Sequence, residues 1–166
     1  QRSDDVITSY SSRGPTRGYY LDAASVKHYD NLIKPDLVAP GNKLIAAQSS
    51  GGASNAVPNT LIQLYPDLDT AVTAVKVNKT MYLSGTSMAA PIVAGAAALL
   101  LQANPTLTPG LVKAILMYTA QPLRGFNTLE QGAGLLNVEG AVRLALLIKP
   151  NAALLSNGTF MLTASF

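Results

Sequence analysis

The feature that most constrains the fold of this 166-residue chain is an uncharged apolar run, Ala89–Leu101, directly behind a turn of small residues. Ser84-Gly85-Thr86 ends a strand-like segment, and a helix is expected over Ser87–Ala103, where Asn104-Pro105 stops it. In this prediction Pro91 still lies in the first helical turn, where its missing N–H costs nothing. Because a bilayer span needs about 20 apolar residues, the run predicts a buried core helix rather than a membrane segment.

The predicted start of this helix places a hydroxyl where backbone N–H groups converge. Such a helix end carries unpaired donors and roughly half a positive charge, so it favours an anion, including the oxyanion that forms when a serine attacks a carbonyl. Ser87 is therefore a candidate nucleophile. The alternative is that Gly85-Thr86-Ser87 is an ordinary helix cap, because Ser and Thr are favoured at N-caps.

The segment GTSMAAP, residues 85–91, resembles the nucleophile segment of the subtilases, the subtilisin-like serine peptidases. Further motifs resemble the C-terminal half of that family and occur in its order: Tyr10–Pro15, Lys34–Gly41, Asn104-Pro105, Leu111–Leu116 and Gly132–Asn137. The resemblance implies an α/β fold, with a mostly parallel sheet and helices on both faces, of which residues 1–150 form only the C-terminal half of the catalytic domain. It also implies peptide-bond hydrolysis through an acyl-enzyme at Ser87.

A nucleophilic serine needs a base to take its proton and a third group to orient that base. In subtilases these are a His in an H-G-T-x-V-A-G motif and an Asp in a D-[ST]-G turn, and neither motif occurs in this chain. The single histidine, His28, has no Gly-Thr after it and is interpreted as an ordinary loop residue, and Asp69-Thr70-Ala71 departs from the Asp motif in its third residue. The resemblance implies that the Asp, the His and the oxyanion-hole Asn lie upstream, so this chain alone is predicted to be inactive.

Within this chain the resemblance leaves a partial site. Ser87 is the nucleophile and its own N–H is one oxyanion donor, Gly85 and Thr86 shape the adjacent backbone, and Met88 lies beside the nucleophile with its thioether open to oxidation. Asp36, in the motif KPDLVAPG, is expected to be a structural hydrogen-bonding residue rather than an acid catalyst. The alternative from another class of protein is a non-catalytic structural or binding module derived from a subtilase, against which the intact GTSMAAP string weighs.

Small aliphatic residues must form the core, because 48% of the residues are hydrophobic and only 6% are aromatic. Gly95, in the middle of the predicted helix, is expected to allow close packing, so that a leucine there would clash. The net charge is +3, but the cations are dispersed, so nucleic acid is not expected as a partner. The absence of cysteine excludes disulfides and thiolate zinc sites, and a single histidine argues against a histidine metal cluster.

Cofactors and partners follow from the resemblance alone. No cofactor is evident, and bound calcium is implied only because it is common in the family. The implied partners are the upstream half of the same domain and a polypeptide substrate, and the unpaired edges of half a parallel sheet predict that an isolated fragment self-associates. The resemblance implies a secreted or cell-envelope protein, although no signal peptide is recognised in this chain.

Two segments are longer than the family usually has and are predicted to be insertions. Residues 17–31 are polar, contain three tyrosines and are expected at the surface. Residues 51–78 are expected to form an elaborated hairpin or loop with two β-like patches, one at Leu61, Ile62 and Leu64 and the other at Val72, Val75 and Val77. This second insertion either rims the substrate cleft or is a mobile surface loop with no role.

The remaining strands and turns are short. Strands are expected at Val6–Tyr10, Leu37–Ala39 and Leu44–Ala47, with the last two buried on either side of a Pro-Gly turn. Residues 151–166 are expected to form a tail hairpin around Asn157-Gly158 that leads into a following domain.

Two more helices follow the central one. The first is expected to begin with Thr108 as N-cap and Pro109 in its first position, and the second follows Asn137 and ends before Pro150. Their apolar stripes are Leu111, Val112, Ile115 and Leu116, and Val138, Ala141, Val142, Ala145 and Leu146.

Overall fold

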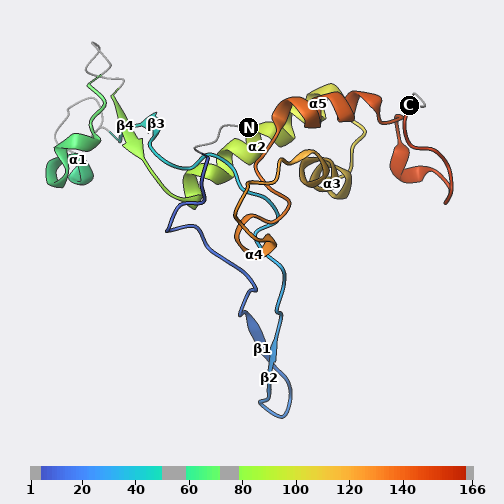
Figure 1. Cartoon of the computed structure of the whole chain (residues 1–166), viewed down its shortest axis with the longest axis horizontal. Helices are drawn as coiled ribbons and strands as arrows, with labels where there is room; N and C mark the ends of the chain where they lie inside the picture. Colours follow the sequence, from blue (N-terminus) through green and yellow to red (C-terminus); the bar gives the residue numbers. More distant parts are fainter. Residues whose placement is uncertain (1–4, 50–58, 72–78, 164–166) are drawn as a thin grey trace. The chain divides into compact units, whose positions relative to one another are not determined.

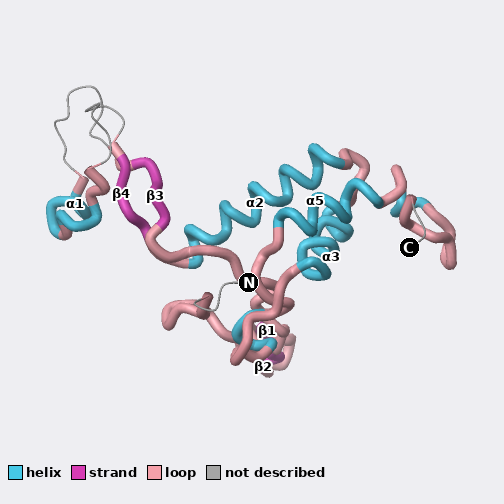
Figure 2. The backbone as a smooth tube through the Cα atoms, turned by 45° about the horizontal axis from the view of Figure 1, so that its top comes forward, coloured by secondary structure: helices cyan, strands magenta, loops and turns pink. Residues whose placement is uncertain are grey.

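The computed structural model describes residues 5–49, 59–71 and 79–163, which belong to two compact units. Unit 1 comprises residues 1–39 and 90–166, and unit 2 comprises residues 40–89. Figures 1 and 2 show the elements, which in chain order are β1 (Tyr19–Leu21), β2 (Lys27–Tyr29), β3 (Leu44–Ala47), α1 (Thr60–Leu64), η1 (Pro66–Leu68), β4 (Thr80–Leu83), α2 (Thr86–Ala103), α3 (Pro109–Thr119), α4 (Thr128–Gln131), α5 (Val138–Leu147) and η2 (Ala152–Leu154). The chain thus has the mixed helices and small sheets of a partial α/β domain.

The sheet of unit 2 is an antiparallel pair, β3 with β4, in which Leu44 lies opposite Leu83 and Ala47 opposite Thr80. The predicted strand Leu44–Ala47 is confirmed, but it is not buried as expected, since Ile45 is 57% exposed. Strand β4 leads directly into the turn that precedes α2. The sheet therefore fixes the backbone on the N-terminal side of that helix.

The described part of the second insertion contains a short helix where a β-like patch was predicted. The carboxamide oxygen of Asn59 accepts hydrogen bonds from the N–H groups of Leu61 and Ile62, and this N-cap starts α1. The local cap therefore overrides the apolar pattern of a five-residue segment. The patch predicted at Val72, Val75 and Val77 lies outside the described residues.

Two described residues of this insertion contact β4. Asp69 forms an antiparallel bridge with Met81, and the Thr70 N–H donates to the carbonyl of Thr80 at 3.3 Å. The hydroxyls of Thr70 and Thr80 are also hydrogen-bonded, at 2.6 Å. The insertion is thus anchored on the strand that leads to the turn before α2.

The core of unit 1 is built from α3, α5 and the second half of α2. The predicted N-cap is confirmed, since the Thr108 hydroxyl caps α3 with Pro109 in its first position. Helix α5 follows Asn137 as predicted, and the Asn137 carboxamide caps it. Leu146, predicted in the stripe of α5, is 60% exposed. As the composition predicted, the buried residues are small or aliphatic: Ala96, Leu100, Leu107, Val112, Ile115, Leu116, Ala141, Ala145, Ile148 and Ala152.

A buried asparagine ties the end of α2 to the end of α5. The side-chain nitrogen of Asn104 donates to the carbonyls of Ala145 and Ile148, at 3.1 and 3.0 Å. Its side-chain oxygen accepts from the N–H and the hydroxyl of Thr106. The Ala145 carbonyl also accepts from the N–H of Ile148, at 3.3 Å. Asn104 thus adds a side-chain donor to the carbonyls at the end of α5 inside the core.

Helix α2 is not the buried core helix that its apolar sequence predicted. Its buried residues are Ala96 and Leu100, whereas Leu99 is 46% exposed, and a Cβ added to Gly95 would meet no atom within 4 Å. The predicted clash at Gly95 is therefore wrong for this chain. By length and composition alone α2 is long and apolar enough to cross a membrane, a criterion that the core helix of a soluble protein also meets.

The position of Pro91 also differs from the prediction. Because α2 begins at Thr86, Pro91 is its sixth residue and lies in the second turn. At this position a proline has no N–H to donate to the carbonyl of Ser87, four residues earlier. The missing donor therefore falls inside the helix, next to the candidate nucleophile.

Three of the motifs that resemble the subtilases contact one another in unit 1, and each contact involves a glycine. A Cβ on Gly14 would lie 2.3 Å from the carbonyl oxygen of Lys34, and a Cβ on Gly132 would lie 2.2 Å from that of Pro35. Gly132 also has a φ of +62°, which disfavours other residues. The motifs at 10–15, 34–41 and 132–137 are thus in backbone contact, and a side chain at either glycine would separate them.

The short strands expected in unit 1 are either absent or present as a single bridge. Val6–Tyr10 forms no strand, and Leu37–Ala39 contributes one parallel bridge, Val38 with Leu135. In the C-terminal segment, η2 replaces the first arm of the expected hairpin, and Leu162 pairs with Ile148 at the end of α5. Parallel pairing is thus represented among the described residues by a single bridge.

Candidate active site

The turn at Gly85 opens α2 and carries the candidate nucleophile. The Gly85 carbonyl accepts the first hydrogen bonds of the helix, from the N–H groups of Met88 at 3.0 Å and Ala89 at 3.3 Å. Gly85 has a φ of +153°, a conformation that L side chains rarely adopt. Ser87 is the second helical residue and is exposed, so it lies in the first turn of α2, at the end of the helix where backbone N–H groups are available.

The two other predicted site residues flank the serine in the same turn. Thr86 is exposed and forms the first residue of α2. Met88 is half-buried, and its sulfur lies 3.9 Å from the position that a Cβ on Gly85 would take. The thioether is thus folded against the turn that leads to Ser87.

Residues 41–43 hold this turn from the side of β3. The Gly85 N–H donates to the Gly41 carbonyl at 2.8 Å. The Ser84 hydroxyl accepts from the Lys43 N–H at 2.8 Å and donates to the side-chain oxygen of Asn42 at 3.1 Å. Sequence reasoning did not single out Ser84 or Asn42, and the only signal was a small polar residue beside each of the two glycine turns.

Asp36 lies between two lysines in unit 1. Its carboxylate binds the ammonium groups of Lys34 and, at 2.9 Å, Lys113. The hydrogen bond from Lys34, followed by that from Lys113, lowers the pKa of Asp36, and the same carboxylate raises the pKa of Lys34. A carboxylate held in this way links α3 to the segment 34–36, which supports the structural role predicted for it.

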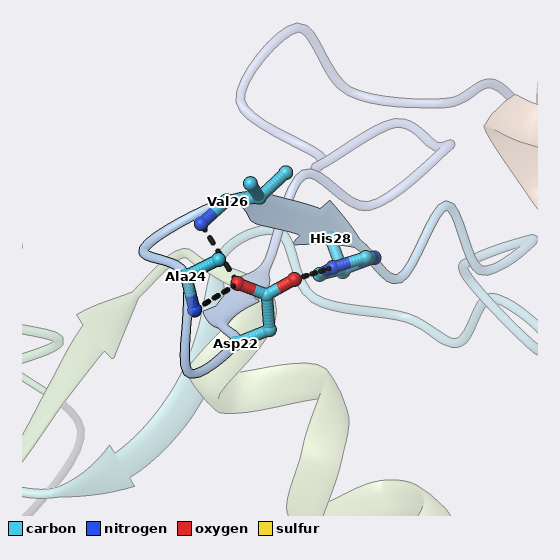
Figure 3. Close-up of polar contacts among 4 residues, drawn as sticks. All are labelled: Asp22, Ala24, Val26 and His28. Atoms are coloured by element: carbon cyan, nitrogen blue, oxygen red, sulfur yellow. Dashed lines mark hydrogen bonds and ion pairs between the residues drawn. The ribbon is translucent and has the colours of Figure 1, made fainter.

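His28 closes a turn on the exposed β1–β2 hairpin (Figure 3). Its Nε2 atom lies 2.8 Å from a carboxylate oxygen of Asp22, and the other oxygen of Asp22 accepts from the N–H groups of Ala24 and Val26. The hydrogen bond from His28, followed by that from Val26, lowers the pKa of Asp22. His28 thus has a local structural partner, in the surface segment predicted at residues 17–31.

Unit 1 also has an apolar groove of about 730 Å³. The groove runs between α2 and α3, and its two charged lining residues are Asp36 and Lys113. Exposed apolar residues of α2, such as Leu101, line it.

The described residues place no base beside the candidate nucleophile. Nothing among them hydrogen-bonds to the hydroxyl of Ser87, and His28 is the single histidine of the chain. Within residues 5–49, 59–71 and 79–163, no group of three His, Cys, Asp or Glu side chains is placed to hold a metal ion. The candidate site within the described residues therefore consists of Ser87, the turn before it and the first turn of α2.

The turn that leads to Ser87, in the first turn of α2, and the converging motifs are those of a subtilisin-like serine peptidase domain, of which this chain has a part. The family model named Peptidase_S8, the subtilase family, matches residues 2–141, and the chain belongs to this family.

Two curated relatives illustrate the similarity. Serine protease AprX of Bacillus subtilis (strain 168) is 36% identical over 140 residues, which cover 84% of this chain and 26% of AprX. Subtilisin-like protease SBT4.13 of Arabidopsis thaliana is 34% identical over 127 residues, which cover 76% of this chain and 14% of that protein. The chain thus spans 26% or less of the length of these relatives.

Among solved structures, the chain is similar to fervidolysin from Fervidobacterium pennivorans, described as a keratinolytic enzyme related to subtilisin. The alignment has 29% sequence identity and a TM-score of 0.48. It covers 63% of this chain and 14% of fervidolysin.

Proposed function

We propose that this chain carries Ser87 as the nucleophile of a serine endopeptidase, which hydrolyses peptide bonds when the rest of its catalytic domain is present. The observation that carries the proposal is the exposed hydroxyl of Ser87 in the first turn of α2, within an unbroken GTSMAAP string in a member of the subtilase family. A helix cap requires one small polar residue and not this whole string. The turn is therefore better suited to nucleophilic catalysis than to capping alone.

In the proposed reaction the Ser87 oxygen attacks the carbonyl carbon of a peptide bond while an upstream His takes the hydroxyl proton. The tetrahedral intermediate carries its negative charge on the former carbonyl oxygen, where the Ser87 N–H donates a hydrogen bond. The His then gives the proton to the leaving amine, which leaves an ester on Ser87. A water molecule, deprotonated by the same His, hydrolyses the ester and restores the serine.

Gly85, Thr86 and Met88 support this reaction without taking part in proton transfer. Gly85 permits the turn that presents Ser87. Thr86 shapes the backbone next to Ser87, on which the substrate would bind. The Met88 thioether is folded against the same turn, so its oxidation to the sulfoxide would place a polar oxygen beside the nucleophile.

The partner proposed for this chain is the upstream half of the same domain, with the Asp, the His and the oxyanion-hole Asn. The groove between α2 and α3 and the exposed apolar residues of α2 support this, because they are surfaces that a core would bury. Without that half we expect the chain to be inactive and to self-associate. A polypeptide is the proposed substrate, with no role for nucleic acid or membrane.

Two further expectations rest on family membership. Calcium is expected to bind to the complete domain, because bound calcium is common in the family. The complete protein is expected to act outside the cell or in its envelope.

Labelling with a fluorophosphonate tests the assignment. The chain is co-expressed with the upstream half of its domain, treated with the probe and mapped by mass spectrometry. We expect the label on Ser87, its loss in Ser87→Ala, and a fall in peptidase turnover of several orders of magnitude, because a triad acts as a unit. Ser156→Ala is the matched control, since it removes an exposed hydroxyl of unit 1 that bonds to Thr159.

Two results would contradict the proposal. Labelling of Ser9, Ser11, Ser12 or Ser84 in place of Ser87 would end the assignment. A stable complex of the two halves that takes up no label would instead identify a non-catalytic module.

A further inference from the structure

The β3–β4 ladder ends one residue before the turn that carries Ser87. Leu44 and Leu83 are its last pair, and the next pair would be Lys43 and Ser84. Lys43 has a φ of +51°, in the left-handed region, so the extended pairing cannot continue through it. The N–H of Lys43 is taken instead by the hydroxyl of Ser84, at 2.8 Å.

Both hydrogen-bonding functions of the Ser84 hydroxyl are used. It accepts from Lys43 and donates to the side-chain oxygen of Asn42, at 3.1 Å, so its rotamer is fixed from both sides. The next residue adds a backbone bond, from the Gly85 N–H to the Gly41 carbonyl at 2.8 Å. Three consecutive residues, 41–43, therefore hold two consecutive residues, 84–85.

The held residues are those that set the position of the nucleophile. The Gly85 carbonyl accepts the first hydrogen bonds of α2, so a displacement of Ser84 and Gly85 would move the first helical turn and Ser87 with it. A glycine in this conformation would otherwise have wide rotational freedom. Close contact leaves little room for such a shift, because a Cβ on Gly41 would lie 2.9 Å from the Gly85 carbonyl oxygen.

The side chains of Ser84 and Asn42 are exposed, so they stabilise no apolar core. A hydrogen bond between exposed groups contributes little to folding, because water competes for both partners. These side chains nevertheless fix the position of the backbone between the end of β4 and the turn at Gly85 that precedes Ser87. A residue that positions a catalytic group typically contributes little to folding stability but fixes the position of the backbone that carries the group.

We infer that Ser84 and Asn42 are positioning residues that hold the Gly85–Ser87 turn in the geometry for attack. The inference rests on the proposed function of Ser87. Neither residue is expected to touch the substrate, so their loss should lower kcat while KM stays within about twofold. Displacements of the order of 1 Å at a reacting atom cost up to about 100-fold in rate, and we expect a fall of roughly 10- to 100-fold.

The experiment uses the chain together with its upstream half. The variants Ser84→Ala and Asn42→Ala remove the two side-chain partners separately, and Ser84→Thr keeps a hydroxyl at residue 84. Steady-state kinetics give kcat and KM, and the rate of fluorophosphonate labelling reports on Ser87 directly. Ser156→Ala serves again as the control, because it removes an exposed serine hydroxyl bond in the other unit.

Hydrogen exchange provides a second measurement that needs no activity. The amide of Lys43 should exchange about tenfold faster in Ser84→Ala than in the unaltered chain, because its acceptor is gone. In Ser84→Thr this protection should return, together with kcat. If Ser84→Ala does not fold, Asn42→Ala, which leaves the Lys43–Ser84 bond in place, still tests the effect on kcat.

The possible outcomes separate this inference from the proposed function. A fall in kcat with unchanged KM in Ser84→Ala, restored in Ser84→Thr and absent in Ser156→Ala, supports the positioning role. Unchanged kcat and labelling rate in both Ser84→Ala and Asn42→Ala, while Lys43 exchanges faster, would overturn it and leave Ser87 as nucleophile. Failure of the unaltered complex to label at Ser87 would overturn the proposed function, and the positioning role with it.

Discussion

The ammonium group of Lys113, on α3, lies 2.9 Å from one carboxylate oxygen of Asp36, while Lys34 binds the other oxygen. Asp36 is only two residues from Val38, which bridges to Leu135. The ion pairs therefore link α3 to the segment on which the family motifs converge. They also keep the carboxylate ionised, which suits a structural link better than an acid catalyst.

The first prediction is that Asp36 makes the stability of the chain depend on pH in acid. Its lysine partners lower the folded-state pKa below the unfolded value of about 4, so the unfolded chain takes up the proton first as the pH falls. The stabilisation is therefore present above about pH 4 and is lost as the pH falls through the lower, folded-state pKa. Since the carboxylate is 34% exposed, the contribution should be below about 1 kcal/mol.

Urea unfolding of the unaltered chain and of Asp36→Asn between pH 7 and pH 3 measures this contribution. The unaltered chain should lose more stability over this range than the variant. Parallel pH profiles for the two proteins would show that the carboxylate is not stabilised in the folded state.

The second prediction concerns Asn104. Asn104→Ala leaves the carbonyls of Ala145 and Ile148 without their side-chain donor inside the core, and we expect a loss of about 1–3 kcal/mol in the free energy of unfolding. Asn157→Ala, at an exposed turn, is the control and should change stability by less than about 0.5 kcal/mol. Equal effects of the two substitutions would argue against the role of Asn104 as an internal cap.

The third prediction compares two glycines. Gly132→Ala should destabilise by at least about 1–3 kcal/mol, because a Cβ would lie 2.2 Å from the Pro35 carbonyl oxygen and φ is +62°. Gly110 lies in α3 with no atom within 4 Å of its added Cβ, so Gly110→Ala should be neutral or stabilise by up to about 1 kcal/mol. Thermal unfolding of both variants decides this, and tolerance of alanine at residue 132 would contradict the contact.

The fourth prediction concerns assembly. In the chain alone Gly95→Leu should leave the melting temperature nearly unchanged, because the space around Gly95 is open. If the upstream half packs on α2, the same variant should weaken the complex, since an added side chain would clash with a closely packed partner. Size-exclusion chromatography with light scattering, with and without the upstream half, measures both states.

A well-folded monomer at high concentration would contradict the predicted self-association of the isolated chain. Undiminished complex formation by Gly95→Leu would show that the partner does not cover this side of α2. Peptidase activity of the pure chain, abolished in Ser87→Ala, would contradict the need for an upstream half.

The starts of α3 and α5 could be predicted because the signal is local. Thr108 followed by Pro109, and Asn137 before an apolar stripe, both satisfy helix N–H groups with side chains a few residues away. Asn59 caps α1 in the same way, although the apolar residues after it have the pattern of a strand. Local capping chemistry is thus the more reliable signal where a helix is only one or two turns long.

Burial and long-range contacts could not be predicted in the same way. The sequence of α2 is apolar on all sides, which indicates a buried helix, but only Ala96 and Leu100 of this helix are buried, because burial is decided by the elements that pack on it and not by its own sequence. The bond between Ser84 and Asn42 joins residues 42 apart in the chain and leaves no periodic pattern. The candidate nucleophile was recognisable from its motif, whereas the residues that hold its turn were not.

The contacts at Gly14 and Gly132 have a consequence for the evolution of this family. These glycines are required by backbone atoms of Lys34 and Pro35, which take no part in the proposed hydrolysis. A descendant that lost its serine would still need them in order to fold. Selection for folding alone would therefore preserve the glycine motifs both in active peptidases and in relatives that have lost activity. The residue at position 87 should distinguish the two groups, whereas the glycine motifs should not.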